Sequence, residues 1–537
     1  MADCQERSGR SCPKLSEDRD VHEVYGLGDA GLFDEFFCFL CELGSMKVLE
    51  QLAPQNRRKR NSPVPFSAVL SIYPMRMIAG LKFFCHIEPV LLKSQAIVQL
   101  VGFNGHRVKQ GVNRRSPDKT SKNYGEKDGV EVGGPICPEF IASFVVSIAG
   151  KVLELVFNKV VALLAANSFF PRNIKALLDA SDLESTEKCK GCGRATKEKA
   201  PELGRRQGRV KKIKVAVFGF KIWVVWDPAS ALPIAMRFAT MEVGDITLAK
   251  EVMEQAISNL GNHAKIVSIA LDRGFMDGKL LWWIDSVGIA FYIPAKSNQN
   301  VYRDALSTVD KGQHSKRERQ RSIGYGKNRR QATDTWEVVG IEKLASAGFY
   351  GELGSGSHEN KKDFQPNPIN AVVVLNDPYG EKNPNIRTLA VPTDGTISKP
   401  LKIYDGYDAR SEIENSLFRE SKQGWSIERP PENSKSGFLV HSYLTIVTMA
   451  LTRAFRDWRI GQEELEDAGE EAGIGKFRQK VAQENSNKCI VFYDDRYAIF
   501  YLYELLILTG TKVPKPRGVP DETAREDILR KYGASSE

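Results

Sequence analysis

Residues 265–296 of this 537-residue chain read KIVSIALDRGFMDGKLLWWIDSVGIAFYIPAK. The continuous apolar run from Ile266 to Leu271 stops at Asp272, and a second apolar run, IAFYIPAK, follows a helical stretch, GKLLWWIDSVG. Apolar runs without polar alternation are typical of strands that helices cover on both faces. The pattern therefore predicts a strand, a helix and a second strand of an α/β sheet.

The segments upstream extend the same sheet. NIKALLDAS, VAVFGFKIWVVWD and LPIAMRFAT, between residues 173 and 240, are short apolar runs that predict three more strands. In ITLAKEVMEQAISNL the apolar residues recur on one face of a helix, from Ile246 to Leu260. We predict a mixed α/β domain over residues 173–296.

The rest of the chain predicts four further parts, as its length allows at roughly 100 to 200 residues per domain. Apolar residues at three- and four-residue steps predict a helical N-terminal domain over 1–172. Residues 297–404, richer in Gly, Pro and Asn, predict a β-rich insertion. Helical patterns return in 405–460, a helical second part of the core, and in 461–537, an α-rich C-terminal segment.

Composition and cysteine usage narrow the class of protein. With 42% hydrophobic and 27% charged residues, the chain is a folded globular protein, and fibrous and wholly disordered classes are excluded. The first 20 residues lack the apolar region of a secretory signal, and charged residues interrupt the longest apolar stretches, so we predict no membrane span. Nine scattered cysteines fit a reducing cytoplasm.

Basic residues are unevenly distributed. The net charge of +9 is modest, but Lys and Arg cluster near residues 57–60, 205–214 and 316–330. Such runs match phosphate-binding surfaces, with ordinary solvated loop charge as the alternative for each. Three in one chain, together with a polar basic loop at 104–129, favour a polyanionic partner.

Several familiar motifs lack the context that they need. Gly26 to Gly31 satisfies G-x-G-x-x-G, but the preceding SEDRDVHEVY is too polar for the strand of a dinucleotide site, so we predict a loop leading into a helix. Two Cys-x-x-Cys pairs, at 38 and 41 and at 189 and 192, lie far apart without a histidine pair, which leaves a zinc site as a minor alternative. No hydrolase motif supports a catalytic triad.

Acidic residues follow two predicted strands. Asp179 comes at the end of NIKALLD and Asp272 at the end of KIVSIALD, and strand ends are where catalytic side chains converge in α/β sheets. For either residue alone, an Asp that begins a turn is the plainer interpretation. Asp182 is a competing candidate for the first acid, since strand boundaries are uncertain by several residues.

A third acid, Glu414, is four residues after Arg410 on a predicted helix, so the two share a helix face. An exposed helical ion pair is the alternative. Three carboxylates at one edge of a sheet repel one another unless cations bind between them, and a pair of Mg²⁺ ions neutralises this electrostatic repulsion. This arrangement favours phosphoryl transfer on nucleic acid.

These segments resemble the bacterial insertion-sequence DDE transposases with an RNase H-like core and a Tyr-Arg-Glu-Lys signature. LLDASDLEST and IALDRGFMDG resemble the segments of the first and second Asp, and GIAFYIPAKSN resembles the strand before the β-rich insertion. YDARSEIENSLFRESKQGW resembles the signature and is the most specific segment. The resemblance, over most of residues 20–510, implies metal-dependent cutting and joining of transposon ends.

The resemblance assigns the catalytic and metal-ligand roles to Asp179, Asp272 and Glu414, with two Mg²⁺ ions for which Mn²⁺ can substitute. It assigns contacts with DNA phosphate near the scissile bond to Tyr407 and Arg410.

Lys422 departs from the signature. The family's Lys usually lies seven residues after its Glu, where this chain has Ser421, so Lys422 is roughly 80° further around an ideal helix. Its role in binding DNA, and with it full activity, is therefore open. The arginines expected to hold the DNA backbone in the insertion are Arg317, Arg319 and Arg321.

We expect a DDE transposase with an RNase H-like catalytic core that a β-rich insertion interrupts, and a helical N-terminal DNA-binding domain. Its expected partners are the double-stranded inverted-repeat ends of an insertion sequence, target DNA and a second copy in a homodimer, in the cytoplasm at the nucleoid. Two alternatives stay open: a nuclease of the same fold that joins no strands, and a catalytically inactive descendant that only binds DNA.

Overall fold

The computed structural model describes most of the chain, and its residues form two compact units. The described residues are 23–53, 66–103, 136, 138–199, 213–295, 297–323, 330–344, 369–378, 387–391, 397–462, 474–493 and 496–508. The first unit contains Met1–Val156, Arg429–Glu432 and Ser436–Glu537, and the second contains Phe157–Glu428 and Asn433–Lys435.

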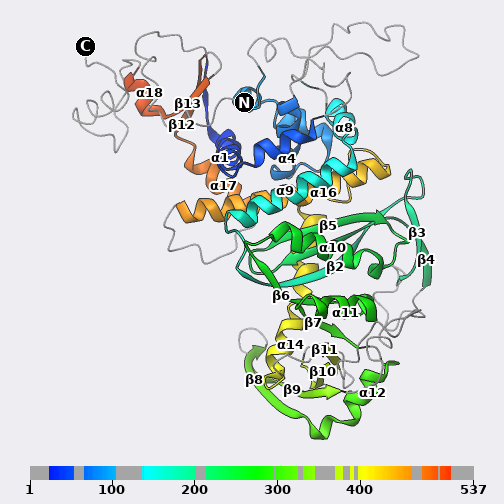
Figure 1. Ribbon diagram of the computed structural model, residues 1–537. Helices are drawn as coiled ribbons and strands as arrows, with labels where there is room; N and C mark the ends of the chain where they lie inside the picture. Colours follow the sequence, from blue (N-terminus) through cyan, green and yellow to red (C-terminus); the bar gives the residue numbers. More distant parts are fainter. Residues whose placement is uncertain are drawn as a thin grey trace. The chain divides into compact units, whose positions relative to one another are not determined.

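A ten-stranded sheet forms the second unit (Figure 1). Its strands are β2 (Asn173–Ser185), β3 (Gly193–Lys199), β4 (Ile213–Asp227), β5 (Leu232–Thr240), β6 (Lys265–Leu271), β7 (Ala290–Pro294), β8 (Gln313–Ile323), β9 (Arg330–Leu344), β10 (Ile369–Asn376) and β11 (Arg387–Val391). Their order in space is β3-β4-β2-β6-β7-β11-β10-β9-β8, and β5 also pairs with β4.

Strand directions in this sheet are mixed. β2, β6 and β7 run parallel, whereas β4 is antiparallel to β2 and β5 is antiparallel to β4. The parallel connections use α10 (Asp245–Leu260) and α11 (Gly278–Ser286), whose apolar stripes are buried as the helical spacing predicts. The mixed α/β sheet expected from the sequence is confirmed.

Within residues 173–296, two strands differ from the sequence expectation. β2 does not end at Asp179 but continues to Ser185, because β4 is long enough to pair with every residue from Leu177 to Ser185. β3, GRATKEK, was not predicted because it has no apolar face; backbone pairing with β4 forms it.

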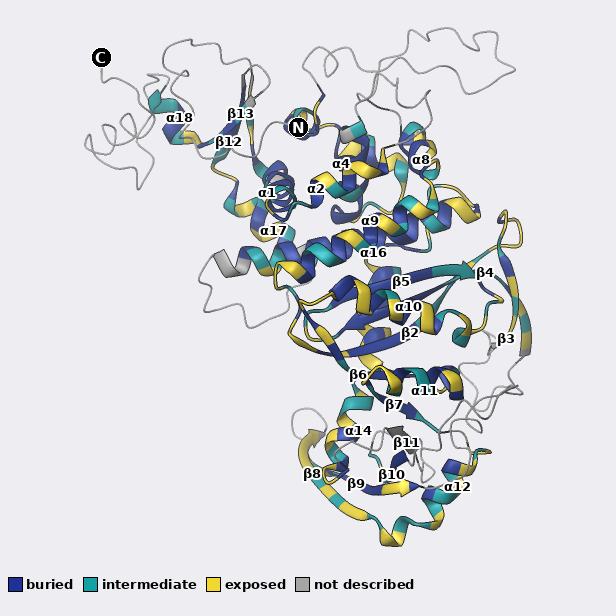
Figure 2. Ribbon diagram, in the orientation of Figure 1, coloured by how far each residue is buried: buried dark blue, intermediate teal, exposed yellow. Residues whose placement is uncertain are grey.

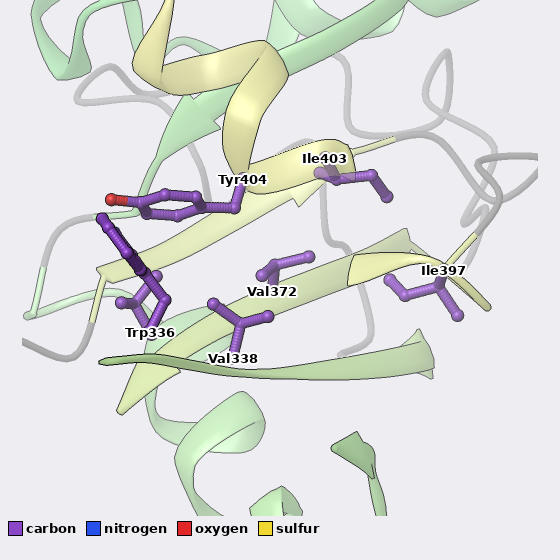
Figure 3. Packing of buried hydrophobic residues seen from close by; sticks show 7 residues of the cluster. Trp336, Val338, Val372, Ile397, Ile403 and Tyr404 are labelled. Atoms are coloured by element: carbon purple, nitrogen blue, oxygen red, sulfur yellow. The ribbon is translucent and has the colours of Figure 1, made fainter. Parts of the chain in front are cut away.

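The insertion continues the core sheet, since β11 pairs with β7. It also contains α12 (Asn300–Ser307), and β8 at the sheet edge carries exposed residues along its length, whereas β5 is mostly buried (Figure 2). A buried cluster joins β9 and β10 to α14 (Pro400–Asp408): Tyr404 lies beside Trp336, and Ile403 and Val372 belong to the same cluster (Figure 3). This packing fixes α14 on the sheet.

The helical segment after α14 changes its hydrogen-bond pattern. A π-helical turn covers Ile413–Phe418, and α15 (Arg419–Gln423) follows it directly. π-Helical turns are rare and frequently lie at functional sites. This turn contains Glu414.

Most elements of the first unit are helical. Its helices are α1 (Gly28–Glu42), α2 (Ser45–Leu49), α4 (Phe66–Ile78), α5 (Ile87–Val90), α6 (Gln95–Leu100), α8 (Pro138–Val146), the first part of α9 (Gly150–Ala166), most of α16 (Lys435–Gln462), α17 (Ile474–Glu484) and α18 (Leu502–Leu508), with 3-10 turns at Glu50–Leu52 and Phe84–His86. Three strands accompany them: β1 (Glu23–Gly26), β12 (Lys488–Tyr493) and β13 (Arg496–Tyr501).

Two expectations for the first unit were wrong. Residues 23–26, part of the stretch judged too polar for a strand, form β1; it pairs antiparallel with β12, so the glycine motif lies in no βαβ unit. Gly31 of that motif has a packing role instead, because a Cβ there would meet the Asn485 side chain at 2.6 Å. Residues 488–493 and 496–501, expected to be α-rich, form two antiparallel strands, since their alternating aromatic and β-branched residues suit strands.

One helix of the first unit is long and apolar. By length and composition, Lys435–Arg459 passes as a membrane span, and the bent pair Pro138–Val146 and Gly150–Ala166 passes if counted together. However, 89% of the apolar window in Lys435–Arg459 is buried within the protein. Burial of that kind is typical of a core helix.

Candidate active site

The register between β2 and β6 brings the first two acids together. Leu178 pairs with Leu271 at the end of the parallel ladder, so the next residues, Asp179 and Asp272, lie side by side at one edge of the sheet. Asp272 leaves the strand with an extended backbone (φ −74°, ψ 158°) and is half-buried. Asp179 is 9% exposed.

The surroundings of Asp179 favour its neutral form. Burial raises the pKa of its carboxyl to about 7, against the opposing effects of a hydrogen bond from the Ala180 N–H (2.8 Å) and of the Arg410 charge. The charges of Glu414 and Asp272 raise this pKa further. Carboxylates that perturb one another in this way are a recurring feature of catalytic sites.

Arg410 connects the first acid to the third. Its Nη1 donates to Asp179 Oδ2 at 3.2 Å and to Glu414 Oε1 at 2.8 Å. Burial alone would lower the pKa of Arg410, but the hydrogen bond to Glu414 and the charges of the three acids together raise it. One guanidinium thus serves as the cation of a cluster that joins β2, the end of β6 and the π-helical turn.

The competing acid, Asp182, lies three residues further along β2. Residues an odd number apart on a strand face opposite sides, and the Asp182 carboxylate forms an ion pair with Lys197 on β3. Its backbone oxygen accepts a hydrogen bond from Lys422 Nζ at 2.7 Å. Asp182 is therefore part of a separate contact network, and Lys197 was missed from the sequence because β3 was.

The predicted DNA-contacting residues differ in what they touch. Tyr407, in the last turn of α14, is partly buried against the cluster of Figure 3. Arg317 lies over the Trp336 ring (4.7 Å) and forms an ion pair with Asp405 at 2.8 Å. Lys422 also pairs with Glu428 at 3.2 Å.

The two remaining arginines of β8 are both exposed. Arg321 pairs with Asp334 of β9 at 2.6 Å. Arg319 has no carboxylate partner within the described part of the chain. Of the three arginines, Arg319 therefore has the guanidinium most available to a phosphate.

Other sequence candidates fall elsewhere. Cys38 is buried in α1 and its thiol donates to Glu42 (3.5 Å), as a core cysteine does, while Cys189 and Cys192 lie between β2 and β3. No group of three His, Cys, Asp or Glu side chains ready to hold a metal ion occurs among the residues that the structure describes. The clusters at 57–60 and 205–212, the basic loop at 104–129, and Lys327 and Arg329 lie outside the described residues.

Comparison with known proteins identifies the family. The model of the transposase DDE domain matches residues 175–452, just over half of the chain, and the match includes Asp179, Asp272 and Glu414. The chain belongs to the DDE transposase family. DNA transposition is the activity that this membership supports, and the family expected from the sequence is confirmed at this level.

Two further comparisons add little. A search of curated proteins gives no match. Among solved structures, a piggyBac transposase in a synaptic complex with hairpin DNA is similar over 92% of this chain and 86% of that chain, with 9% sequence identity and a TM-score of 0.37.

The acids of this DDE transposase suit a divalent cation by their chemistry. Carboxylate oxygens are the ligands that Mg²⁺ and Mn²⁺ prefer, and the pKa of Asp179 is raised mainly by burial and further by the charges of Glu414 and Asp272. In this structure Arg410 contacts both Asp179 and Glu414. Arg410 Nη1 therefore supplies positive charge between these two acids.

Proposed function

We propose that this transposase cuts DNA strands at the inverted-repeat ends of an insertion sequence and joins them to a target, using an RNase H-like core of the Tyr-Arg-Glu-Lys subgroup. One observation carries the proposal: Asp179 and Asp272 lie on neighbouring strands, and Arg410 connects Asp179 to Glu414. The strand order β5-β4-β2-β6-β7, in which only β4 runs opposite to the other four strands, supports the core assignment.

Asp179, Asp272 and Glu414 would hold two Mg²⁺ or Mn²⁺ ions. Bound there, such ions supply Lewis acidity that activates water or a 3′-hydroxyl and stabilises the leaving oxygen of a phosphodiester. Asp179 must first lose the proton that its raised pKa favours near neutrality. The planar guanidinium of Arg410 would be able to hold the scissile phosphate by two parallel hydrogen bonds.

Further residues would orient the DNA. Tyr407 precedes Arg410 by one helical turn and would contact the same phosphate. Arg319, with Arg317 and Arg321 beside it on β8, would hold the backbone further away. We also propose a homodimer that bridges two ends, a cytoplasmic location, and the five-part division of the chain, with residues 1–172 binding DNA and the α-rich residues 461–537 as the C-terminal segment.

A plasmid assay tests the proposal. Purified protein and Mg²⁺ are incubated with a plasmid that carries this gene and its flanking DNA, and every cut and joint is mapped. Asp272→Ala and Glu414→Ala are expected to abolish cleavage while DNA binding stays measurable. Glu412→Ala is the matched control, because this exposed acid is two residues from Glu414 and points to another side of the helix.

Each pattern of products has a distinct meaning. Cuts at two inverted ends, followed by joining and absent in both variants, support the proposed transposase. Scattered cuts without joining indicate a nuclease, and tight binding of the ends without cuts indicates an inactive descendant. Retained cleavage in Asp272→Ala removes Asp272 from the mechanism.

A further inference from the structure

The buried residues around the π-helical turn have an unusual spacing. Counting from Ile413, the next buried positions of the helical segment are four, five and eight residues on: Leu417, Phe418 and Ser421. An amphipathic α-helix buries positions three, four and seven on. The segment therefore matches an α-helical stripe with one extra residue between Ile413 and Leu417.

A π-helical turn accommodates that extra residue. Its hydrogen bonds join residues five apart rather than four, so one turn contains about one residue more than an α-helical turn. In a regular α-helix, eight residues would turn Lys422 about 80° away from the direction of Glu414. With one residue taken up by the π turn the angle falls to about 20°, as for a Lys seven residues on in a regular α-helix.

The contacts of Lys422 give this geometry a consequence. Its ammonium donates to the backbone oxygen of Asp182 on β2 and forms an ion pair with Glu428. Asp182 is three residues after Asp179 on the same strand. Lys422 thus ties the helical segment that carries Glu414 to the strand that carries Asp179.

We propose that the π turn at Ile413–Phe418 is a one-residue insertion that keeps Lys422 in register, and that Lys422 is a positioning residue which holds the two halves of the acid cluster together. The departure in Glu-to-Lys spacing is then compensated in the backbone, and it gives no reason to expect an inactive protein. The catalytic consequence of this inference rests on the proposed function. The contacts of Lys422 and the spacing of the buried residues do not depend on the proposed function.

Single-residue deletions test the register. Deletion of Asn415, exposed in the π turn, leaves a regular α-helix in which Lys422 keeps its direction and the buried stripe becomes ideal. Deletion of Arg419, exposed in α15, is the matched control, because no helix type then keeps both Phe418 and Lys422 in their directions. If the π turn remains, Lys422 is turned away, and if a regular α-helix forms, Phe418 is turned away. We expect cleavage by the Asn415 deletion within about threefold of wild type, and about a 100-fold loss for the Arg419 deletion.

Hydrogen exchange supplies a readout without DNA or metal. Amide exchange of the β2 peptide containing Asp182 is expected to stay at the wild-type rate in the Asn415 deletion and to speed up in the Arg419 deletion. Lys422→Met should speed it up as well, and Lys422→Arg, which keeps the donor, should restore both the slow exchange and the cleavage. Because the exchange is measured on the protein alone, its result stands even if wild type cuts no DNA.

The opposite results overturn the inference. An Asn415 deletion that unfolds, or that loses as much cleavage as the Arg419 deletion, shows that the π turn is no tolerated insertion. If neither deletion folds, the Lys422 variants decide: wild-type exchange and cleavage in Lys422→Met remove its positioning role.

Discussion

Asp179→Asn is expected to stabilise the metal-free protein while abolishing DNA cleavage. The carboxyl is 9% exposed, and burial with the two neighbouring acids raises its pKa from 3.8 to about 7. Asparagine keeps the shape and the oxygen that accepts the Ala180 N–H, but it removes the buried charge. Arg410 retains its bond to Glu414.

The expected gain follows from the pKa difference. In the unfolded chain the carboxyl loses its proton near pH 4, whereas in the folded protein it does so near pH 7. Between these values the folded state binds more protons, so this group's contribution to stability falls as the pH rises. Three pKa units correspond to about 4 kcal/mol at pH 8, and the lost bond to Arg410 lowers the expected net gain to about 2 to 4 kcal/mol.

Urea unfolding in EDTA at pH 8 and pH 5 measures the effect. Trp223 and Trp226, both buried on β4, report unfolding of the sheet by fluorescence. The stabilisation by Asp179→Asn should be largest at pH 8 and shrink toward pH 4. Added Mg²⁺ should stabilise wild type and leave Asp179→Asn unchanged, because a cation that binds only the folded state adds to its stability.

Asp227→Asn is the control for burial without crowding. The Asp227 carboxylate is 1% exposed and accepts hydrogen bonds from the Ala229 N–H and from the N–H and hydroxyl of Ser230. Its replacement is expected to cost about 1 to 3 kcal/mol, since donors lose a charged acceptor. If Asp179→Asn destabilises the protein at pH 8 in EDTA by as much as Asp227→Asn does, the interpretation of Asp179 as a functional acid whose buried charge destabilises the fold is refuted.

Two further changes have expected outcomes. Arg319→Ala should reduce the salt dependence of DNA binding by about one phosphate contact, which titrations at several salt concentrations measure. Arg317→Ala should mainly destabilise the insertion, because it removes the contacts with Trp336 and Asp405. An equal change in salt dependence for the two variants would contradict this expectation. Gly219→Ala should prevent folding or lower the melting temperature sharply, because Gly219 has φ +151° and a Cβ would lie 2.1 Å from the Leu183 oxygen. Gly244→Ala is the control: a Cβ there has its nearest neighbour at 3.6 Å, so the melting temperature should change little.

The sequence predicted those parts of the fold that its own apolar pattern specifies. β2, β4, β5, β6 and β7 are continuous apolar runs, and each was expected. β3 and β8 are polar on both faces and exist because a neighbouring strand pairs with them, so no local signal distinguishes them from basic loops. The β12 and β13 strands did have a local signal, the alternating aromatic residues on either side of Asp-Asp. The helical periodicity of the same stretch outweighed this signal in the sequence-based prediction.

The same distinction between local sequence signals and tertiary contacts applies to the candidate site. Asp179 and Asp272 were found because each follows a buried run, and their proximity needs only the parallel register of two strands. The contact from Arg410 to Asp179 joins residues 231 positions apart and depends on tertiary packing. The π turn did have a local signal, because the buried spacing is one residue too long for an α-helix, but the spacing becomes visible only once burial is known.

The insertion contributes to the site through its own core. Tyr404 packs beside Trp336 of β9 (Figure 3), and Arg317 of β8, which lies over the Trp336 ring, pairs with Asp405, so residues of the insertion hold α14 in place. Arg410 follows α14 by two residues and is aimed at Asp179 by that helix. Because catalytic groups must be held within fractions of an ångström, a change at Trp336 is expected to shift Arg410 through α14. The segment that separates the second acid from the third in sequence is therefore expected to help align them in space.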